Sequence, residues 1–447
     1  MNSRVPPRVA VIGAGISGVV TAAHLKREGL DVTVFERSRV AGGIWPCYFG
    51  LKNNVATRLL ETTLSPFPSG TPDFVSHQVL KKYIQDTAVK AAVHDVTFYN
   101  TNVENVRKSG SKWNLEAVTL TPGPLGRPTR ESFIKEFDFV VVASGHYHAP
   151  KVPNIPGLAD WKRLWPDRVQ HSKAYRKPDD FKGKNFLLIG GSVSSTDIAR
   201  ELSPLANNIY QSHRNGAFDL PGSLLPDNAT QVDEIESFNK IPESRTTFLQ
   251  GTDPIPATLT LKSGRKLCDV HHVIICTGYY MTIPFLNHLQ SNETPAEKVD
   301  DFLLVTNGTQ VHNLHKDIFY IPDPSLVFVG VPFFTATFTL FEFQAMVVAK
   351  VLSGQVSLPF EKEMRAEYQQ RVKEKGYGKA FHSLRDKEVE YVNELLAWVN
   401  RDLRASGVKE LSGHTNIWKQ AKEEQVARMK AMFAGDSGFE RQLNITC

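Results

Sequence analysis

Cysteine is scarce in this sequence, and no two cysteines are close enough to act as a pair. The 447 residues contain 4, namely Cys47, Cys268, Cys276 and Cys447, and no CxxC motif occurs. Structural zinc sites and dithiol redox centres need such pairs, so the sequence disfavours both. The same scarcity indicates a reduced protein of the cell interior, and we expect a cytoplasmic location.

Long runs of positive charge and long apolar runs are scarce too. The formal net charge is only +5, without a Lys/Arg cluster, so we predict no nucleic-acid partner. Residues 326–352 are the segment most apolar in character, but they contain Pro332, Glu342 and Gln344. We therefore predict a buried strand followed by a core helix there, and no membrane partner.

A metal site is also disfavoured. His146 and His148 are two residues apart, but no acidic residue or third histidine lies at ligand spacing. The remaining composition, 41% apolar and 22% charged, is that of a globular protein with an ample core. Its length suits two large domains or about three ordinary ones.

Residues 8–37 have the order strand, glycine turn, helix, strand. The glycines Gly13, Gly15 and Gly18 follow a short apolar run in the spacing GxGxxG. In a dinucleotide site the first glycine allows the tight turn, the second lets a pyrophosphate approach, and the third lets helix and strand pack closely. The phosphates would lie at the helix N-terminus. A structural βαβ unit with accidental glycines is the alternative.

The second strand of this unit, 32–35, ends in Glu36. An acid at this position accepts hydrogen bonds from the two hydroxyl groups of a ribose. The glycine pair Gly42-Gly43 follows, next to Ile44 and Trp45. These residues suit either a close approach of the backbone to a ligand or a turn beside a core tryptophan.

The pattern repeats in a degenerate form at 185–204. The glycine turn reads Gly190, Gly191, Ser192, and Ser195 replaces the last glycine. The strand that follows the helix, 208–211, ends in Ser212-His213-Arg214 instead of an acid. A hydroxyl and a guanidinium suit a ribose 2′-phosphate, so we predict NADPH here. Arg214 could also be an ordinary surface charge.

Two apolar strands, at 137–145 and 270–276, each follow one glycine motif and end in a glycine-containing turn. We therefore predict an α/β fold with two Rossmann-like dinucleotide-binding domains and a helical C-terminal segment. The NADPH domain, 156–280, would be inserted between two parts of the FAD domain, 1–155 and 281–447.

Several segments resemble motifs of the flavin-containing monooxygenase family, class B flavoprotein monooxygenases, and most closely its fungal members. They are GAGISG at 13–18, GGIW at 42–45, LWPDRVQHSKAYR at 164–176, GGSVSS at 190–195 and the stretch 311–330. The third resembles the signature FxGxxxHxxxYR, with Trp165 for Phe and Asp167 for Gly. The loop between Trp45 and Leu51 is shorter than in animal or yeast members.

The resemblance implies FAD at the first site, NADPH at the second, and a set of cofactor-binding residues on both. These are Gly13, Gly15, Ser17, Gly18, Glu36, Arg37, Gly43, Ile44, Trp45, Asn53, Gly145, His171, Gly190, Ser192, Ser194, Ser195, Ser212, Arg214 and Gln344. It also implies a catalytic asparagine beside the flavin, in a segment resembling LxTNxP. In GLKNNVATR that residue aligns with Asn54, and Asn53 lies one position away; a simple turn is the alternative.

By resemblance the enzyme transfers one atom of O2 to an amine nitrogen or a sulfur of a small molecule through C4a-hydroperoxyflavin. A role in fungal secondary metabolism would suit it. A Baeyer–Villiger enzyme acting on ketones would end the signature in Trp-Pro or Trp-Asp, where this chain has Tyr175-Arg176. A flavin disulfide reductase would need a cysteine pair, and a non-catalytic binding protein would not need both nucleotide sites. The oligomeric state is left open, a homodimer included.

Overall fold

The structure, a computed structural model, describes residues 5–43, 48–123, 127–178, 181–240 and 251–432. The chain divides into two compact units. Unit 1 consists of Met1–Pro46, Lys52–Ala149 and Tyr280–Gln425, and unit 2 consists of Cys47–Leu51, Pro150–Tyr279 and Val426–Cys447. The functional domain boundaries expected at 155 and 280 stay a prediction.

The strands in the unit 1 part of the chain are β1 (Arg8–Ile12), β2 (Asp31–Phe35), β3 (Thr97–Phe98), β4 (Thr101–Ser109), β5 (Lys112–Pro122), β6 (Pro128–Phe137), β7 (Phe139–Val142), β18 (Leu314–His315), β19 (Phe319–Tyr320) and β20 (Leu326–Phe328). The helices outside residues 150–279 are α1 (Ile16–Arg27), α2 (Thr57–Leu60), α3 (His77–Lys90), α6 (Thr337–Leu352), α7 (Glu361–Lys375), α8 (Glu388–Ala405) and α9 (Asn416–Met432). Short 3₁₀ helices are η1 (His94–Val96), η5 (Pro284–Leu289), η6 (Ala296–Lys298) and η7 (Lys379–His382).

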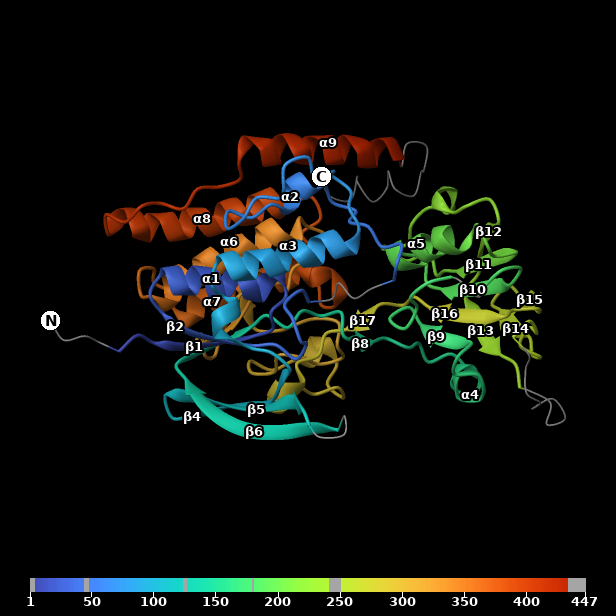
Figure 1. Cartoon of the computed structure of the whole chain (residues 1–447), viewed down its shortest axis with the longest axis horizontal. Helices are drawn as coiled ribbons and strands as arrows, with labels where there is room; N and C mark the ends of the chain where they lie inside the picture. The colour runs from blue at the N-terminus through green and yellow to red at the C-terminus, as the bar shows by residue number, and fades with distance from the viewer. Residues whose placement is uncertain (1–4, 44–47, 124–126, 179–180, 241–250, 433–447) are drawn as a thin grey trace. The chain divides into compact units, whose positions relative to one another are not determined.

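Unit 1 is layered around a sheet whose strand order is β18-β19-β20-β7-β1-β2-β3. The strands from β20 to β3 run parallel, and β18 and β19 are antiparallel. Helices α1, α3, α6 and α8 cover one face, and the antiparallel sheet β4-β5-β6 lies on the other (Figure 1). Val9 and Val11 of β1 enter the helical core, whereas Ala10 and Ile12 enter the other core. Burial on both faces explains why β1 is apolar throughout.

The apolar segment 326–352 folds as predicted, into strand β20 and core helix α6. Its Glu342 is buried and accepts hydrogen bonds from the backbone and hydroxyl of Thr63, at 2.8 and 2.6 Å, and lies 3.1 Å from His24. Along the described stretches of the chain, no helix is long and apolar enough to cross a membrane.

The elements from residue 149 to 280 are strands β8 (Ala149–Pro150), β9 (Val169–His171), β10 (Asn185–Ile189), β11 (Asn208–Ser212), β12 (Ala229–Val232), β13 (Ile235–Phe238), β14 (Leu259–Leu261), β15 (Lys266–Leu267), β16 (His272–Ile275) and β17 (Tyr279–Tyr280), and helices α4 (Leu158–Leu164), α5 (Val193–Leu202) and η3 (Gly222–Leu224). The main sheet of unit 2 has the order β12-β11-β10-β16-β9, and its strands are parallel. Each unit therefore contains a parallel strand–glycine turn–helix–strand motif, as the sequence predicts.

Candidate functional site

The first glycine turn leaves no room for side chains at two of its positions. Gly13 has φ +109°, and a Cβ there would lie 2.6 Å from the carbonyl oxygen of Ala143 at the end of β7. A Cβ on Gly18 would lie 1.9 Å from the Gly13 oxygen. Gly15 is the N-cap residue of helix α1, whose N-terminus has no side-chain hydrogen bond as a cap. The turn therefore offers uncapped N–H groups at the carboxyl end of parallel strands, where phosphates bind.

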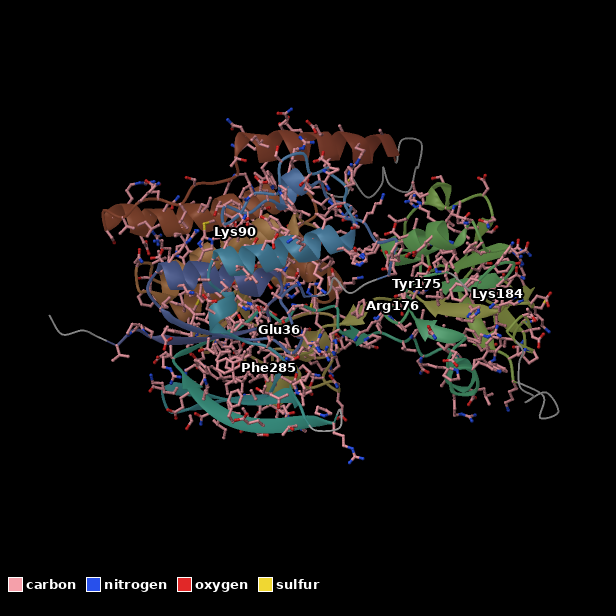
Figure 2. The ribbon with its side chains drawn as sticks, viewed as in Figure 1. Glu36, Lys90, Tyr175, Arg176, Lys184 and Phe285 are labelled. Atoms are coloured by element: carbon pink, nitrogen blue, oxygen red, sulfur yellow. The ribbon has the colours of Figure 1, made fainter. Side chains whose placement is uncertain are left out.

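Glu36 follows β2 and is buried beside this turn (Figure 2). Its Oε2 accepts the N–H of Ala14 at 2.7 Å, and its Oε1 accepts the N–H of Ser38 at 2.8 Å. Each carboxylate oxygen keeps a second lone pair, so the group can still accept a ribose hydroxyl. Arg37 is exposed, and its guanidinium lies 3.0 Å from the ring nitrogens of His148.

A second glycine pair lies against the first turn. Gly42 donates its N–H to the oxygen of Ala14 at 3.0 Å, and a Cβ on Gly43 would lie 3.2 Å from the Gly15 Cα. Both residues have positive φ, +138° and +62°. The structure thus brings Gly43 to the predicted FAD site; the predicted contacts of Ile44 and Trp45 lie outside the described residues.

Ser17 and Gln344 are buried near the start of α1. The Ser17 hydroxyl donates to the oxygen of Ala143 at 3.3 Å. The Gln344 oxygen accepts the N–H of Gly330 at 3.0 Å, and its amide donates to Tyr391 at 2.7 Å. Because these polar groups have protein partners, the structure shows a structural role for them, and their cofactor contacts stay predictions.

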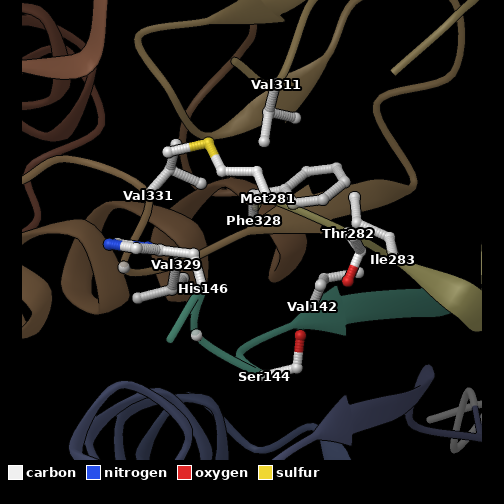
Figure 3. Close-up of a pocket in the computed structure, with 12 residues that line it drawn as sticks. Val142, Ser144, His146, Met281, Thr282, Ile283, Val311, Phe328, Val329 and Val331 are labelled. Carbon is white, nitrogen blue, oxygen red and sulfur yellow. The ribbon is translucent and has the colours of Figure 1, made fainter. Parts of the chain in front are cut away.

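Gly145 lines a small pocket at the carboxyl ends of β7 and β20 (Figure 3). The pocket has room for about 30 Å³ of water and is lined mainly by apolar side chains, among them Val142, Met281 and Phe328. His146 points its ring into the same region. Burial, and then the electrostatic effect of the neighbouring His382 and Lys379, lowers the pKa of His146 to about 4. This histidine is therefore neutral near pH 7.

The two adjacent asparagines have different environments. Asn53 is buried; its amide donates to the oxygens of Val55 and Asp73, at 2.6 and 2.7 Å, and its Oδ1 accepts the N–H of Val75 at 2.6 Å. Asn54 is exposed, and its side chain has no hydrogen bond to a described residue. Asn53 thus holds two loops together, while the Asn54 amide is available to a ligand.

The second glycine turn, in unit 2, has the same backbone with different side chains. Gly190 has φ +119°, and a Cβ there would lie 2.7 Å from the oxygen of Cys276. Ser192 is the N-cap residue of α5, but its side chain makes no capping hydrogen bond, and Ser194 is exposed in the first turn of the helix. Ser195 is buried, donates its hydroxyl to the Ser192 oxygen at 2.8 Å and accepts a hydrogen bond from Gln211 at 2.9 Å.

At the end of β11 the strand register identifies the residue equivalent to Glu36. Ile12 pairs with Phe35 in unit 1, and Ile189 pairs with Ser212 in unit 2. His213 therefore takes the place of Glu36. Ser212 is buried and donates its hydroxyl to the Asp233 oxygen at 2.9 Å, whereas Arg214 is exposed. The predicted cofactor contacts of Ser212 and Arg214 stay predictions, and Arg214 is the better placed for a ligand.

The segment that resembles the family signature contributes to the interior of unit 2. His171 Nε2 lies 3.0 Å from the Gly278 oxygen, and its Nδ1 accepts the N–H of Lys173 at 3.1 Å. Burial lowers the pKa of His171. Tyr175 is buried, and the oxygen of Arg176 accepts the N–H of Phe49 at 2.8 Å (Figure 2). The observed bonds of His171 are structural, and its cofactor contact stays a prediction.

The C-terminal helix α9 contacts helix α2 and the first residue of helix α8, which the sequence does not connect with it. Glu424 accepts a hydrogen bond from Arg58 at 2.6 Å, close to Asn54. The Trp418 indole donates to the Leu59 oxygen at 3.3 Å. Lys422 binds the buried Glu388 at 2.7 Å.

Glu388 itself binds the loop before α6. Its Oε1 accepts hydrogen bonds from the Thr335 hydroxyl at 2.8 Å and from the Ala336 N–H at 2.9 Å. No sequence signal indicates this role, because Glu388 lies 52 residues from Ala336. Helix α9 thus supports helix α2, which follows Asn54 in the chain, and through Glu388 it supports the loop before α6.

These features define a class of protein, one with two dinucleotide cradles on two parallel sheets. Both turns have an uncapped helix N-terminus, and one has a carboxylate suited to a ribose; the residues present therefore fit FAD in unit 1 and a nicotinamide dinucleotide in unit 2. Among the described residues, no three His, Cys, Asp or Glu side chains form a group that could hold a metal ion.

Comparisons with known proteins agree with this class. Residues 6–224 match the FMO-like family, described as flavin-binding monooxygenase-like. The chain is 44% identical to the flavin-containing monooxygenases ustF2 and ustF1 of Aspergillus flavus, over 93% of this chain and over 96% and 88% of theirs. The solved S-allyl-L-cysteine S-oxygenase of Allium sativum is 25% identical, with a TM-score of 0.70 over 98% of this chain and 97% of that one. The chain belongs to the flavin-containing monooxygenase family and is a monooxygenase.

Proposed function

We propose that this enzyme uses FAD and NADPH to transfer one atom of O2 to an amine nitrogen or a sulfur of a small molecule. The pair of uncapped glycine turns supports two dinucleotides, and Glu36 beside the first turn carries the assignment of FAD to unit 1. Likeness to an S-oxygenase supports a soft nucleophile as substrate. Likeness to two flavin-containing monooxygenases of Aspergillus flavus supports the monooxygenase reaction, and we propose a place in fungal secondary metabolism for this enzyme.

The side chains of this protein bind and orient the cofactors and the substrate, and we assign no proton-transfer step to them. When bound, the cofactors supply the redox chemistry: hydride from the nicotinamide to the flavin, and activation of O2. In unit 1 the N-terminus of α1 would hold the pyrophosphate and Glu36 would hold a ribose. In unit 2 the N-terminus of α5 would hold the second pyrophosphate and Arg214 would attract the 2′-phosphate.

We assign Asn54 the orienting role near the reacting atoms. Its amide offers one acceptor and two N–H donors. The buried Asn53 fixes the backbone beside it through three hydrogen bonds. The unit 1 pocket at Gly145 has a mainly apolar lining, which would disfavour water beside a reactive oxygen donor.

The cofactor assignment is tested with the purified protein. We expect it to be yellow, to contain FAD, and to be bleached faster by NADPH than by NADH under anaerobic conditions. O2 consumption and hydrogen peroxide yield are then measured across amines, sulfides and ketones. A nitrogen or sulfur compound should couple NADPH oxidation to product; coupling by ketones alone would reject the proposal.

The role of Asn54 is tested by Asn54→Ala. We expect the variant to keep its FAD and its reduction by NADPH but to release peroxide, with product formation falling about tenfold or more. Asn102→Ala, which removes an exposed asparagine from β4, is the matched control. Unchanged coupling in Asn54→Ala would place the orienting role elsewhere.

A further inference from the structure

The end of β11 lacks the acid that Glu36 provides at the end of β2. The amide N–H of Gly13 donates to the Phe35 oxygen, and that of Gly190 donates to the Ser212 oxygen, each at 2.8 Å. The two turns are therefore superimposable position by position, and His213 occupies the position of Glu36.

A carboxylate reaches the second turn from a loop instead. The N–H of Leu220 donates to the Gly191 oxygen at 2.7 Å, which docks the loop on the turn. A Cβ on Gly191 would lie 2.8 Å from Asp219 Cγ. In unit 1 the residue at the Gly191 position is Ala14, whose N–H binds Glu36 at 2.7 Å. Asp219 and Glu36 thus lie beside the same residue of their respective turns.

The position of Asp219 is fixed by its surroundings. Its Oδ2 accepts the N–H of Gly216 at 2.9 Å and lies 3.8 Å from His213 Nδ1. Asn215 takes the left-handed conformation, φ +54°, that turns the backbone toward the carboxylate. The Asp219 side chain is only 22% exposed. It is part of the site, unlike a mobile surface aspartate.

We propose that Asp219 is the ribose-binding acid of unit 2 and a determinant of coenzyme specificity. Its free lone pairs accept the ribose 2′-hydroxyl of NADH, and its charge repels the 2′-phosphate of NADPH, while Arg214 attracts that phosphate. Asp219 therefore lowers the ratio of the affinity for NADPH to the affinity for NADH, and it allows NADH to bind. This inference rests on the proposed use of a nicotinamide dinucleotide by unit 2.

The alternative is that Asp219 only closes the turn from 214 to 219. Asp219→Asn separates the two roles, because the asparagine oxygen still accepts the Gly216 N–H while the charge is removed. The probes are adenosine 2′,5′-bisphosphate and 5′-AMP, whose dissociation constants for the FAD-loaded full-length protein are measured by calorimetry. The matched control is Asp227→Asn, which removes the same charge from an exposed residue just before β12. Asp227 lies at the amino-terminal ends of the parallel strands, whereas the glycine turn follows the carboxyl end of β10.

We expect Asp219→Asn to bind the bisphosphate about tenfold more tightly and 5′-AMP about equally or more weakly, and Arg214→Gln to weaken the bisphosphate alone. Asp227→Asn should change neither constant by more than about twofold. An unchanged ratio of the two constants in Asp219→Asn would overturn the inference and leave the donor site intact. Failure of the wild-type protein to bind either probe would reject the donor site itself, and the inference with it.

Discussion

Gly13 and Gly190 make the same turn in two different units, but the helix that follows each turn packs on its strand in a different way. A Cβ on Gly13 would lie 2.6 Å from the oxygen of Ala143, just after β7. A Cβ on Gly190 would lie 2.7 Å from the oxygen of Cys276, just after β16. Five residues later unit 1 has Gly18, where a Cβ would lie 1.9 Å from a backbone oxygen, and unit 2 has the buried Ser195. In the first turn, helix and strand pack in direct contact at Gly18. In the second, the side chain of Ser195 lies between helix and strand and makes its own hydrogen bonds.

The comparison shows at which positions of a glycine motif the backbone geometry requires glycine. The first glycine is required wherever the strand turns into the helix, because positive φ and the neighbouring carbonyl leave no alternative. The third position depends on the distance between helix and strand, so it can carry serine. The acid that binds the ribose can come from the strand end, as Glu36 does, or from a loop, as we propose for Asp219.

Gly18→Ser makes the first turn resemble the second and has the largest expected effect. The new Cβ would overlap the Gly13 oxygen, so helix α1 must move away from β1, at a cost of about 3 kcal/mol. We expect the protein to lose FAD and to unfold at lower urea concentration. Flavin absorbance and urea unfolding measure both; a variant that keeps full flavin content would show that α1 has room to move.

Glu36→Gln tests the acid of unit 1. Glutamine can accept only one of the two backbone N–H bonds of Glu36, and it lacks the charge that strengthens a ribose hydrogen bond. We expect FAD to bind about 30-fold more weakly, about 2 kcal/mol, with binding of 2′,5′-bisphosphate by unit 2 unchanged. Asp31→Asn, at the other end of β2, is the matched control, and equal flavin losses in the two variants would contradict the role of Glu36.

His272→Phe tests a difference between the equivalent strands β7 and β16, in which a phenylalanine of unit 1 corresponds to a histidine of unit 2. His272 in β16 takes the position that Phe139 has in β7, by the pairings with β10 and β1. Burial, and then the charges of Arg168, Lys184 and His271, lower the pKa of His272 to about 3. The folded state keeps this ring neutral while the unfolded state binds a proton below about pH 6.5, so stability falls as the pH decreases below that value.

We expect His272→Phe to remove about 1.4 kcal/mol of the stability loss between pH 7.5 and pH 5.5, as measured by urea unfolding at both values. The exposed His94 of unit 1 gives the control variant His94→Phe. A pH dependence identical to that of the wild type would show that the ring binds a proton as readily in the folded state as in the unfolded state.

Ser195→Ala has the smallest expected effect. It keeps the Cβ that spaces the turn but removes the acceptor of the Gln211 amide, at a cost of about 1 kcal/mol. Because the hydroxyl is engaged within the protein, the dissociation constant of 2′,5′-bisphosphate should change less than about twofold. A tenfold weaker affinity at unchanged stability would show instead that the Ser195 hydroxyl reaches the nucleotide, as the sequence predicts.

The sequence predicts the parts of the fold that repeat a local pattern. The strands and helix around Gly13 and those around Gly190 were predictable, because apolar runs and glycine spacing are local signals. Strand β6 was not predicted, since its residues are largely exposed and polar and its pairing with β5 decides its conformation. The equivalence of His213 to Glu36 needed the strand register, which sequence-based strand ends do not give.

The candidate site was less predictable, because polar groups choose partners that are distant in sequence. Asn53 and Asn54 are indistinguishable by type, and only the position of the loop at Asp73–Val75 shows which amide is free. Gln344 binds Gly330 and Tyr391, and no periodicity indicates these partners. Asp219 reaches Gly191 across a loop whose course depends on Asn215.

The ties of α9 have a consequence for the order in which the protein is completed during synthesis. The strands, the glycine turns and Asn54 all precede residue 330, but Arg58 and Glu388 bind Glu424 and Lys422 of helix α9, which is synthesised after all of them. The segment beside Asn54 therefore gains these two ion pairs only after every strand and both glycine turns have been made. We expect a nascent chain to be able to acquire FAD before it can hold the segment beside Asn54 in place.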